Sequence, residues 1–536
     1  MRGRRGWIAG TAAVVVLALV AGGVLVLRER AARERREAAA AAEAFLRAWQ
    51  ERRYDDLDAL TAGADAPGDA YRRTDERLLV EQAELTPGEL SEDGRTVPFD
   101  AVLRLAGLGE YAYSGTLAVR DTDDGWRVAF TPASLHPALE NGQRLDRRRD
   151  PAPRAQVLDR AGRPVREASP DLAANVLGTV GAAPEATGAV LAGEPTGLTG
   201  LERVLQDRLA GQPGGAVVVA DALDGRELTV LREYQGAPGE DVVTTLDLDV
   251  QAAAEQAIAG LASRAALVAV DVATGEVRAV ANSPVSGIPA SFASYAPGSV
   301  FKVVTATAAL LEGTGPDTVV DCPANVTVGG RAFRNDEGLV ALGQVPFERA
   351  FASSCNTTLI SLAGQLPDGA LARAAELYGF GRTDLLPIAV EGGEVPEPAS
   401  DVEAAAAAIG QGRVEASPLL IASMSAAVAS GTWQQPRLLP GEGASTPIPA
   451  EAAEPLRRMM RAVVTSGTGT AADLPGPPVH GKTGTAQYGT GEPPPTHAWF
   501  TGFRGELAFA VFVETGASGG SVAAPAARRF LAALPG

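Results

Sequence analysis

The hydrophobic pattern of the chain begins with its longest apolar run, which extends without a charge from Trp7 to Leu27. That length suffices to cross a bilayer as a helix, and the Arg-, Glu- and Ala-rich residues 28–50 continue the helical pattern. A cleaved signal peptide usually has a shorter apolar core, although Val20 to Gly22 offers a weak cleavage site. We therefore expect a tail over 1–6 and an uncleaved membrane anchor over 7–27, with a cleaved signal as the alternative.

Alternating apolar and polar positions follow this run. Four alternating stretches separated by turn residues predict antiparallel strands packed with the preceding helix, and they cover 79–85, 97–105, 111–119 and 126–130. Further on, strands are expected on either side of the turn at Asp224 and Gly225, with helical patterns over 197–209 and 244–261. Neither region carries an evident set of catalytic residues, so we interpret them as a small spacer module and a pedestal.

From residue 265 the pattern changes to apolar strands that alternate with apolar helices. A hairpin over 266–271 and 277–281 precedes a helix over 300–311. Further elements are expected as helices over 404–409, 419–429 and 525–534 and as strands over 498–501 and 507–514. Helices before, between and after the strands predict an α/β-type sandwich.

The helix over 300–311 carries a candidate catalytic residue. It is apolar on every side apart from Lys302 and two threonines. A helix of this kind is buried, and Ser299 at its start lies one turn from Lys302. Burial lowers the pKa of a lysine, and a hydroxyl beside a neutral amine is an activated nucleophile. The two residues therefore predict covalent catalysis with Ser299 as nucleophile and Lys302 as base.

Composition strengthens this interpretation. Of the 47 basic residues in the chain, only Lys302 and Lys482 are lysines. Arginine stays charged and cannot act as a base, whereas a buried lysine can. Ser354 and Asn356 form a Ser-x-Asn sequence between the two lysines, and Lys482 opens a Lys-Thr-Gly sequence. Ser-x-x-Lys, Ser-x-Asn and Lys-Thr-Gly in this order are typical of penicillin-binding proteins and class A β-lactamases.

Charge and the remaining reactive side chains narrow the classes of function that the sequence allows. A formal net charge of −18 argues against a nucleic-acid partner. Cys322 and Cys355 fit neither a disulfide scaffold nor a zinc site. Cys322 could pair with Cys355, but the sequence gives no distance between them and leaves the pairing open. For Cys355 we expect a small buried role rather than a second nucleophile. His480 and His497 flank the Lys-Thr-Gly sequence without an acidic partner at ligand spacing, so we expect packing histidines and no metal.

On these motifs, residues from about 144 to the end resemble the class B penicillin-binding proteins, which are monofunctional peptidoglycan D,D-transpeptidases. Residues from about 38 to 138 resemble the NTF2-like N-terminal domain of the branch that includes the low-affinity resistance protein of staphylococci. The resemblance implies an α/β (α+β) multidomain protein whose transpeptidase-like sandwich contains an antiparallel sheet. Its expected domains are NTF2-like over 28–143, pedestal or dimerisation over 144–250, and transpeptidase over 251–536.

The resemblance also implies that Ser299, Lys302, Ser354, Asn356 and Lys482 are the catalytic residues. Ser299 attacks the carbonyl of the penultimate D-Ala of a stem peptide, and Lys302, held neutral by burial, takes its proton. Ser354 relays protons to the leaving nitrogen, and Asn356 bonds the substrate amide and Lys302. A second stem peptide then attacks the acyl-enzyme through its amine and forms the cross-link.

Substrate binding and partners follow from the same resemblance. Lys482, Thr483 and Thr485 meet the substrate carboxylate, Gly484 leaves room for a peptide along its strand, and the N–H groups of Ser299 and Thr485 form the oxyanion hole. The expected ligands are D-Ala-D-Ala stem peptides and β-lactams, with no cofactor. The expected setting is a single-pass membrane protein with its catalytic domain outside the cytoplasm, and a SEDS-type glycan polymerase is a candidate partner.

Two other classes of function share these motifs. A serine β-lactamase needs a base for rapid deacylation, and Glu391, Glu394 and Glu415 lie in the right interval without forming a clear motif. A β-lactam sensor or a non-catalytic scaffold is the other alternative. The intact set of three motifs favours the enzyme over a scaffold.

Overall fold

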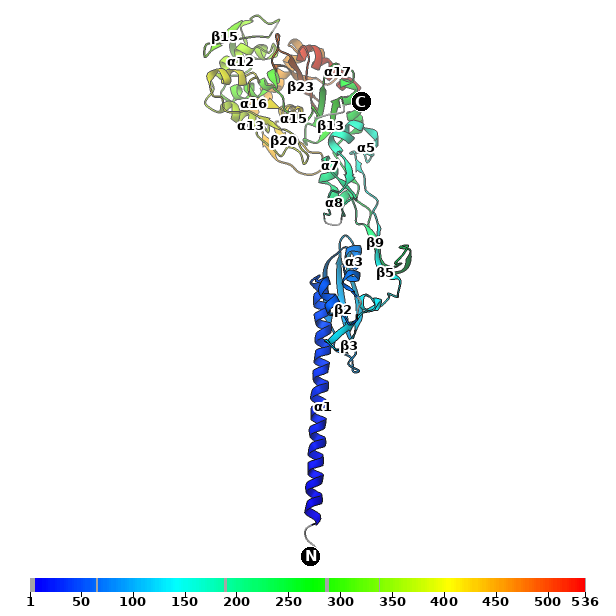
Figure 1. The fold of residues 1–536 in the computed structure, drawn as a ribbon. Helices are drawn as coiled ribbons and strands as arrows, with labels where there is room; N and C mark the ends of the chain where they lie inside the picture. The colour runs from blue at the N-terminus through cyan, green and yellow to red at the C-terminus, as the bar shows by residue number, and fades with distance from the viewer. Residues whose placement is uncertain (1–4, 64–65, 188–189, 285–288, 337, 536) are drawn as a thin grey trace. The chain divides into compact units, whose positions relative to one another are not determined.

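The computed structural model describes residues 5–63, 66–187, 190–284, 289–336 and 338–535, with the side chains of 5–21 excepted. It divides into two compact units. The first contains residues up to 154 together with 182–195 and 210–239, and the second contains 155–181, 196–209 and the chain from 240 onward (Figure 1). Residues 144–250, expected as one pedestal, therefore contribute to both units.

A four-stranded antiparallel sheet with strand order β1-β2-β3-β4 forms the body of the first unit. Its strands are β1 (Val80–Pro87), β2 (Thr96–Leu105), β3 (Gly109–Thr122) and β4 (Gly125–Ala129), which confirms the four predicted runs. Every second residue of β2 is buried, because successive side chains of a strand point to opposite faces. The helices α1 (Arg5–Gln50), α2 (Tyr54–Ala59) and α3 (Gly68–Leu78) complete this part.

Aromatic side chains fill the core between α1, α3 and this sheet. Trp49 and Tyr71 meet edge to face with ring centroids 4.6 Å apart, and Phe99 packs against Trp49 from β2. The predicted helix over 28–50 is confirmed as the end of α1 that carries Trp49. A second sheet of the same unit has the order β10-β9-β5, from β5 (Gln143–Asp150), β9 (Gly214–Asp221) and β10 (Glu227–Tyr234).

The predicted membrane span over 7–27 lies for the most part outside the residues whose side chains the structure describes. Within the described part of the chain, no helix has an apolar stretch of the length that a bilayer requires.

A five-stranded antiparallel sheet is the centre of the second unit, with strand order β13-β12-β24-β23-β22. The strands are β12 (Ala265–Asp271), β13 (Val277–Ser283), β22 (His480–Gln487), β23 (Thr496–Arg504) and β24 (Leu507–Val513). The predicted hairpin and the two predicted final strands are confirmed, and the hairpin pairs with β24 although more than 220 residues separate them.

Helices cover both faces of this sheet, so its strands are apolar on both sides. Leu267 packs with α9 (Leu248–Ile258) and α17 (Ala524–Ala533) on one face. Its neighbour Val268 packs with α10 (Lys302–Leu311) and α15 (Pro418–Ser430) on the other. The sandwich predicted from the order of elements is thus confirmed.

The helices of the segment 155–209 share their core with this sheet. They are α5 (Val165–Ala168), α6 (Pro170–Leu172), α7 (Gly200–Val204) and α8 (Gln206–Leu209), so the single helical stretch expected over 197–209 is in fact two short helices. The Asp171 carboxylate is buried and accepts a hydrogen bond from the backbone N–H of Asn282 at the end of β13. Burial raises the pKa of Asp171 to about 6.

Between α10 and α15 the chain forms elements that carry the Ser-x-Asn sequence. They are β14 (Val319–Cys322), β15 (Asn325–Val328), β16 (Arg331–Arg334), β17 (Gly343–Pro346), α11 (Phe347–Ala352), α12 (Asn356–Ala363), α13 (Ala370–Glu376) and α14 (Asp401–Ala407). The helix α16 (Ala450–Ser466) then leads to β22. The sequence pattern predicted α14 and missed most of the others.

Candidate active site

The turn that carries Ser299 lies against the Lys-Thr-Gly strand. A short 3-10 helix, Gly298–Phe301, precedes α10, so the predicted helix starts with a tighter turn. Gly298 has φ +52°, and a Cβ on it would lie 2.4 Å from the carbonyl oxygen of Thr485 in β22. The Trp499 indole N–H also donates to the Ala296 carbonyl at 3.0 Å. Ser299 is held there with 4% of its surface exposed.

Ser354 occupies a left-handed turn between α11 and α12. Its φ is +58°, a conformation that costs a non-glycine residue roughly 1–3 kcal/mol and persists only when the surrounding structure fixes it. The turn gives the Ser354 side chain two lysine neighbours. Its Oγ lies 3.2 Å from Lys302 Nζ and 2.9 Å from Lys482 Nζ, so one hydroxyl joins the two lysines of the chain.

Lys302 is fully buried in a set of oxygen atoms. Its ammonium donates to the Ser354 carbonyl at 2.8 Å and to the Asn356 side-chain oxygen, besides approaching Ser354 Oγ. Among the hydrogen bonds of the described residues, none joins Lys302 to Ser299, so the direct contact expected from helical spacing is not formed in this state. A neutral lysine has two N–H bonds and one lone pair, and the two carbonyl oxygens match the two N–H bonds.

Lys482 is the second fully buried lysine. It donates to Ser354 Oγ and, at 3.0 Å, to the Thr483 carbonyl, and it lies 5.6 Å from the Phe351 ring centroid. Burial lowers the pKa of Lys302 to about 8. Burial and then repulsion by Lys302 lower the pKa of Lys482 well below its usual value. The two groups therefore disfavour holding two positive charges at once.

The strand β22 presents the Lys-Thr-Gly sequence to this site. Thr483 Oγ1 bonds the hydroxyl of Thr468, and the Gly519 N–H donates to Thr485 Oγ1 at 3.4 Å. A Cβ on Gly484 would lie 2.9 Å from the Pro297 carbonyl oxygen. The missing side chain at Gly484 thus makes room for the Ser299 turn, a reason that the strand pattern alone does not supply.

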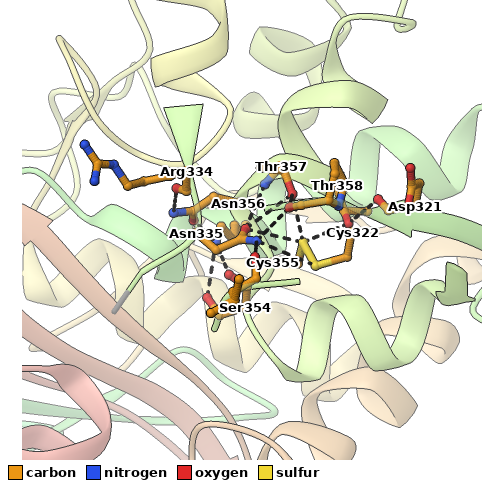
Figure 2. The surroundings of a disulfide bond; sticks show 12 residues. Asp321, Cys322, Arg334, Asn335, Ser354, Cys355, Asn356, Thr357 and Thr358 are labelled. Carbon is orange, nitrogen blue, oxygen red and sulfur yellow. Dashed lines mark hydrogen bonds between the residues drawn. A yellow bond between two sulfur atoms is a disulfide. The ribbon is translucent and has the colours of Figure 1, made fainter. Parts of the chain in front are cut away.

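Asn356 and its neighbour Cys355 tie α12 to the preceding loop. The Asn356 amide donates to the Arg334 carbonyl at 3.0 Å and to Asp336 Oδ1 at 3.2 Å. Cys355 forms a disulfide with Cys322 (Figure 2), which decides a pairing that the sequence left open. The reason is tertiary: β14 pairs with β17, and α11 follows β17 directly, which brings residues 33 positions apart to a Cα separation of 6.2 Å.

These residues line or support a cleft of about 460 Å³ in the second unit. Ser299, Ser354, Thr483 and Thr485 line it, whereas Lys302, Asn356 and Lys482 lie buried behind its wall. All eight predicted site residues are therefore brought to one place. The lining also contains residues that sequence reasoning missed, namely Asp336, Gly338, Leu339, Ser353, Ser466, Gly467, Thr468, Ser518, Gly520 and Ser521. No motif marks them, because they come from four separate segments of the chain.

His480 at the start of β22 and His497 on β23 pack against aromatic rings, as expected. His480 stacks on Phe503 with ring centroids 4.4 Å apart. His497 Nδ1 lies 2.6 Å from the Glu514 carbonyl oxygen, and its ring stacks on Tyr488. Trp499, on the same strand as His497, is fully buried and packs against Phe512.

The arrangement is suited to acyl transfer. A hydroxyl on a rigid turn opens into a cleft, with a low-pKa amine behind it and a second hydroxyl that can accept a proton from one lysine and donate to the other.

Comparison with known proteins assigns this chain to a family. The model described as penicillin binding protein transpeptidase domain matches residues 265–532, half of the chain.

The chain belongs to the penicillin-binding protein transpeptidase family. Two further family models match it, the NTF2-like N-terminal transpeptidase domain at 37–143 and the penicillin-binding protein dimerisation domain at 163–244. The family assignment thus agrees with the resemblance inferred from the motifs.

Individual relatives are distant in sequence. The peptidoglycan D,D-transpeptidase MrdA of Acinetobacter baumannii is 28% identical over 396 residues, which cover 61% of this chain and only 58% of MrdA. A structure titled as a peptidoglycan synthase complex that coordinates polymerization and crosslinking matches with TM-score 0.62 and 27% identity, over 74% of this chain and 92% of that one. Penicillin-binding protein 3 of Mycobacterium tuberculosis with ampicillin matches with TM-score 0.57 and 25% identity, over 72% and 95%.

Proposed function

We propose that this penicillin-binding protein is a peptidoglycan D,D-transpeptidase that works through an acyl-enzyme on Ser299. The observation that carries the proposal is the single hydroxyl, Ser354 Oγ, within hydrogen-bond distance of both buried lysines behind the cleft that Ser299 lines. The family assignment and a relative named as a D,D-transpeptidase support the same reaction.

The first half-reaction forms an ester. Ser299 Oγ attacks the carbonyl carbon of the penultimate D-Ala, and its proton passes to the lone pair of neutral Lys302. The N–H groups of Ser299 and Thr485 would bind the oxyanion that forms. Collapse of the tetrahedral intermediate breaks the peptide bond, and the leaving D-Ala nitrogen receives a proton from Lys302 through Ser354. In the second half-reaction an acceptor amine attacks the ester, loses a proton by the reverse route and releases Ser299.

Binding of the substrate would prepare this proton transfer. A terminal carboxylate beside Thr483 and Thr485 brings a negative charge to Lys482, and a nearby opposite charge favours the protonated lysine. A charged Lys482 in turn disfavours a charged Lys302. The substrate carboxylate would thus assign the proton to Lys482 and leave Lys302 as the base.

The alternative of a β-lactamase has less support in the cleft. The glutamates in the expected interval do not line it: Glu391 accepts a hydrogen bond from the Ser294 N–H, and Glu394 pairs with Glu415 in a two-stranded ladder. Without a base for deacylation, a β-lactam ester on Ser299 should persist. A non-catalytic scaffold would not need the lysine–serine–lysine arrangement.

Intact-protein mass spectrometry after penicillin addition tests the reaction and its nucleophile together. We expect one stable adduct on the full chain, none on Ser299→Ala, and an unchanged adduct on Ser353→Ala, which removes a neighbouring hydroxyl of the same cleft. Rapid turnover of a chromogenic cephalosporin would support the β-lactamase instead. Full complementation of a deletion strain by Ser299→Ala would support a scaffold.

We also propose that residues 7–27 anchor the protein in the cell membrane with the catalytic unit outside the cytoplasm. The support is the uncharged length of this run and the location of stem peptides in the cell wall. A protease site engineered near residue 200 should be cut in intact spheroplasts, and protection there would exclude this topology.

A SEDS-type glycan polymerase is the partner we propose, because a similar structure belongs to a synthase complex. Co-expression should increase cross-linked product from lipid-linked precursor.

A further inference from the structure

Arg334 at the end of β16 and the two residues that follow it, Asn335 and Asp336, dock on the Ser-x-Asn sequence. The Arg334 carbonyl and Asp336 Oδ1 both accept hydrogen bonds from the Asn356 amide, at 3.0 and 3.2 Å. Between them, Asn335 Oδ1 accepts from the backbone N–H of Thr357 at 3.2 Å. The segment 334–336 therefore holds the first turn of α12 through both the Asn356 side-chain amide and the Thr357 backbone N–H (Figure 2).

This contact is fixed from both sides. The Asn335 amide donates to the Pro323 carbonyl at 2.9 Å, and Asn335 is 6% exposed. Pro323 follows Cys322, whose disulfide to Cys355 ties this end of β14 covalently to the residue before Asn356. The hydrogen bonds of Arg334 and Asn335, together with the disulfide, thus hold Asp336 beside Asn356. Its position does not depend on the exposed Asp336 side chain alone.

The cleft lining is otherwise without charge. Among the described residues that line it, Asp336 is the one that carries a charge, and the others are hydroxyl-bearing, glycine or apolar residues. The charged groups that act on this region are therefore Lys302 on α10, Lys482 on β22 and Asp336 on the loop. The carboxylate acts on both lysines in the sense opposite to burial, since its negative charge raises the pKa of each.

We propose that Asp336 is a positioning residue of this site, whose carboxylate orients the Asn356 amide and supplies the negative charge that the two buried lysines face. Its charge and its hydrogen bond have separate effects. The hydrogen bond directs the Asn356 side-chain oxygen to Lys302, because the amide nitrogen is engaged on the other side. The charge keeps a proton on the lysine pair that burial and mutual repulsion would otherwise remove.

The two lysines make this inference directly measurable. Lysine labelled with 13C at Cε gives two side-chain signals from the full chain in detergent, because the sequence holds only Lys302 and Lys482. Assignment comes from Lys482→Arg, which leaves a single lysine. Asp336→Asn keeps an acceptor for Asn356 and removes the charge, so we expect both titration midpoints to fall, by roughly half a pH unit or more.

Two matched variants separate charge from structure. Asp321→Asn removes one charge from the neighbouring strand β14, where Asp321 bonds Thr358 through its backbone carbonyl, and it should leave both midpoints unchanged. Asp336→Glu should restore most of the wild-type midpoints. Identical midpoints in Asp336→Asn and wild type would overturn the inference.

Acylation gives an independent second measurement, and this part rests on the proposed function. The rate constant for penicillin acylation should rise with pH at a lower midpoint in Asp336→Asn than in the wild type. A uniform loss of rate with an unchanged midpoint would reduce Asp336 to a structural contact and overturn the inference. A wild type that penicillin never acylates would contradict the proposed function, whereas the lysine titration would still decide the role of Asp336.

Discussion

Ser354 Oγ accepts a hydrogen bond from Lys482 Nζ at 2.9 Å, and the same oxygen lies 3.2 Å from Lys302 Nζ. The hydroxyl is the link between a lysine on the nucleophile helix and a lysine on the edge strand of the sheet. Because a hydroxyl can accept and donate at once, a proton can cross between the lysines without either side chain moving. The strained backbone of Ser354 is the means by which the oxygen reaches both.

Replacement of Ser354 by alanine tests this link. Ser354→Ala leaves Ser299 and both lysines in place but removes the oxygen between them. We expect the rate constant for penicillin acylation to fall roughly 100- to 10,000-fold, the usual range for loss of a positioned proton-transfer group. Stopped-flow acylation measures it, and a loss of less than about threefold would contradict the relay.

The role of Lys302 as a base predicts a particular pH dependence. The amine must be neutral to take the Ser299 proton, and burial sets the pKa of Lys302 at about 8, so acylation should accelerate as pH rises through about 8. Lys302→Arg should be as inactive as Lys302→Ala, because arginine keeps its proton. Normal acylation of the arginine variant would show that the site needs only a positive charge.

Burial of Lys302 also links stability to pH. Its pKa is about 8 in the folded chain against 10.5 for an ordinary lysine, so the unfolded state binds more protons between these values and stability rises with pH across that window. Relative to Lys302→Met, the wild type should gain about 2 kcal/mol in free energy of unfolding between about pH 7 and about pH 9.5. Urea unfolding of both proteins measures the difference, and a gap that is constant over this range would exclude the lowered pKa.

The approach of the nucleophile turn to β22 predicts an intolerance to alanine. Gly298→Ala requires a side chain at φ +52° and places its Cβ 2.4 Å from the Thr485 carbonyl oxygen. Gly313→Ala is the control, because Gly313 has φ +89° with no atom within 4 Å of its Cβ position. Both variants carry the cost of the left-handed backbone, and Gly298→Ala should lose roughly 1–3 kcal/mol more from the collision. Equal unfolding midpoints would contradict the packing argument.

The disulfide between Cys322 and Cys355 predicts a redox-dependent stability. Replacing both cysteines by serine should lower the free energy of unfolding by about 4 kcal/mol, the effect expected for a closed loop of this length. Addition of a reductant to the wild type should produce the same loss and should not affect the double variant. Acylation should slow as well, because Cys355 lies between Ser354 and Asn356. Identical urea midpoints with and without reductant would show that the bond is absent.

The motif residues could be found from sequence because their chemistry restricts the choice of side chain. Lys302 and Lys482 stood out against a background of arginine, and the apolar helix after Ser299 indicated a buried site. The sheet was predictable where both faces are covered, since continuous apolar runs such as β12 and β24 mark such strands.

The rest of the site depends on long-range contacts that no local pattern encodes. No sequence motif marks Asp336. Its carboxylate meets Asn356 only because the tertiary fold brings residues 20 positions apart together. Cys322 and Cys355 gave the same difficulty, because two cysteines in 536 residues are too few to indicate a disulfide framework. Gly484 was recognised, but its structural reason lies 187 residues away in the chain, at Pro297.

Complete burial of Lys302 and Lys482 has a practical consequence for handling the folded protein. An endoproteinase that cuts only after lysine has two target bonds in the whole sequence, and both are enclosed with the catalytic groups. Digestion by such an enzyme would therefore begin only when this one region opens. The rate at which the first fragments appear would then measure how often the cleft opens, and fraying elsewhere in the chain would not affect it.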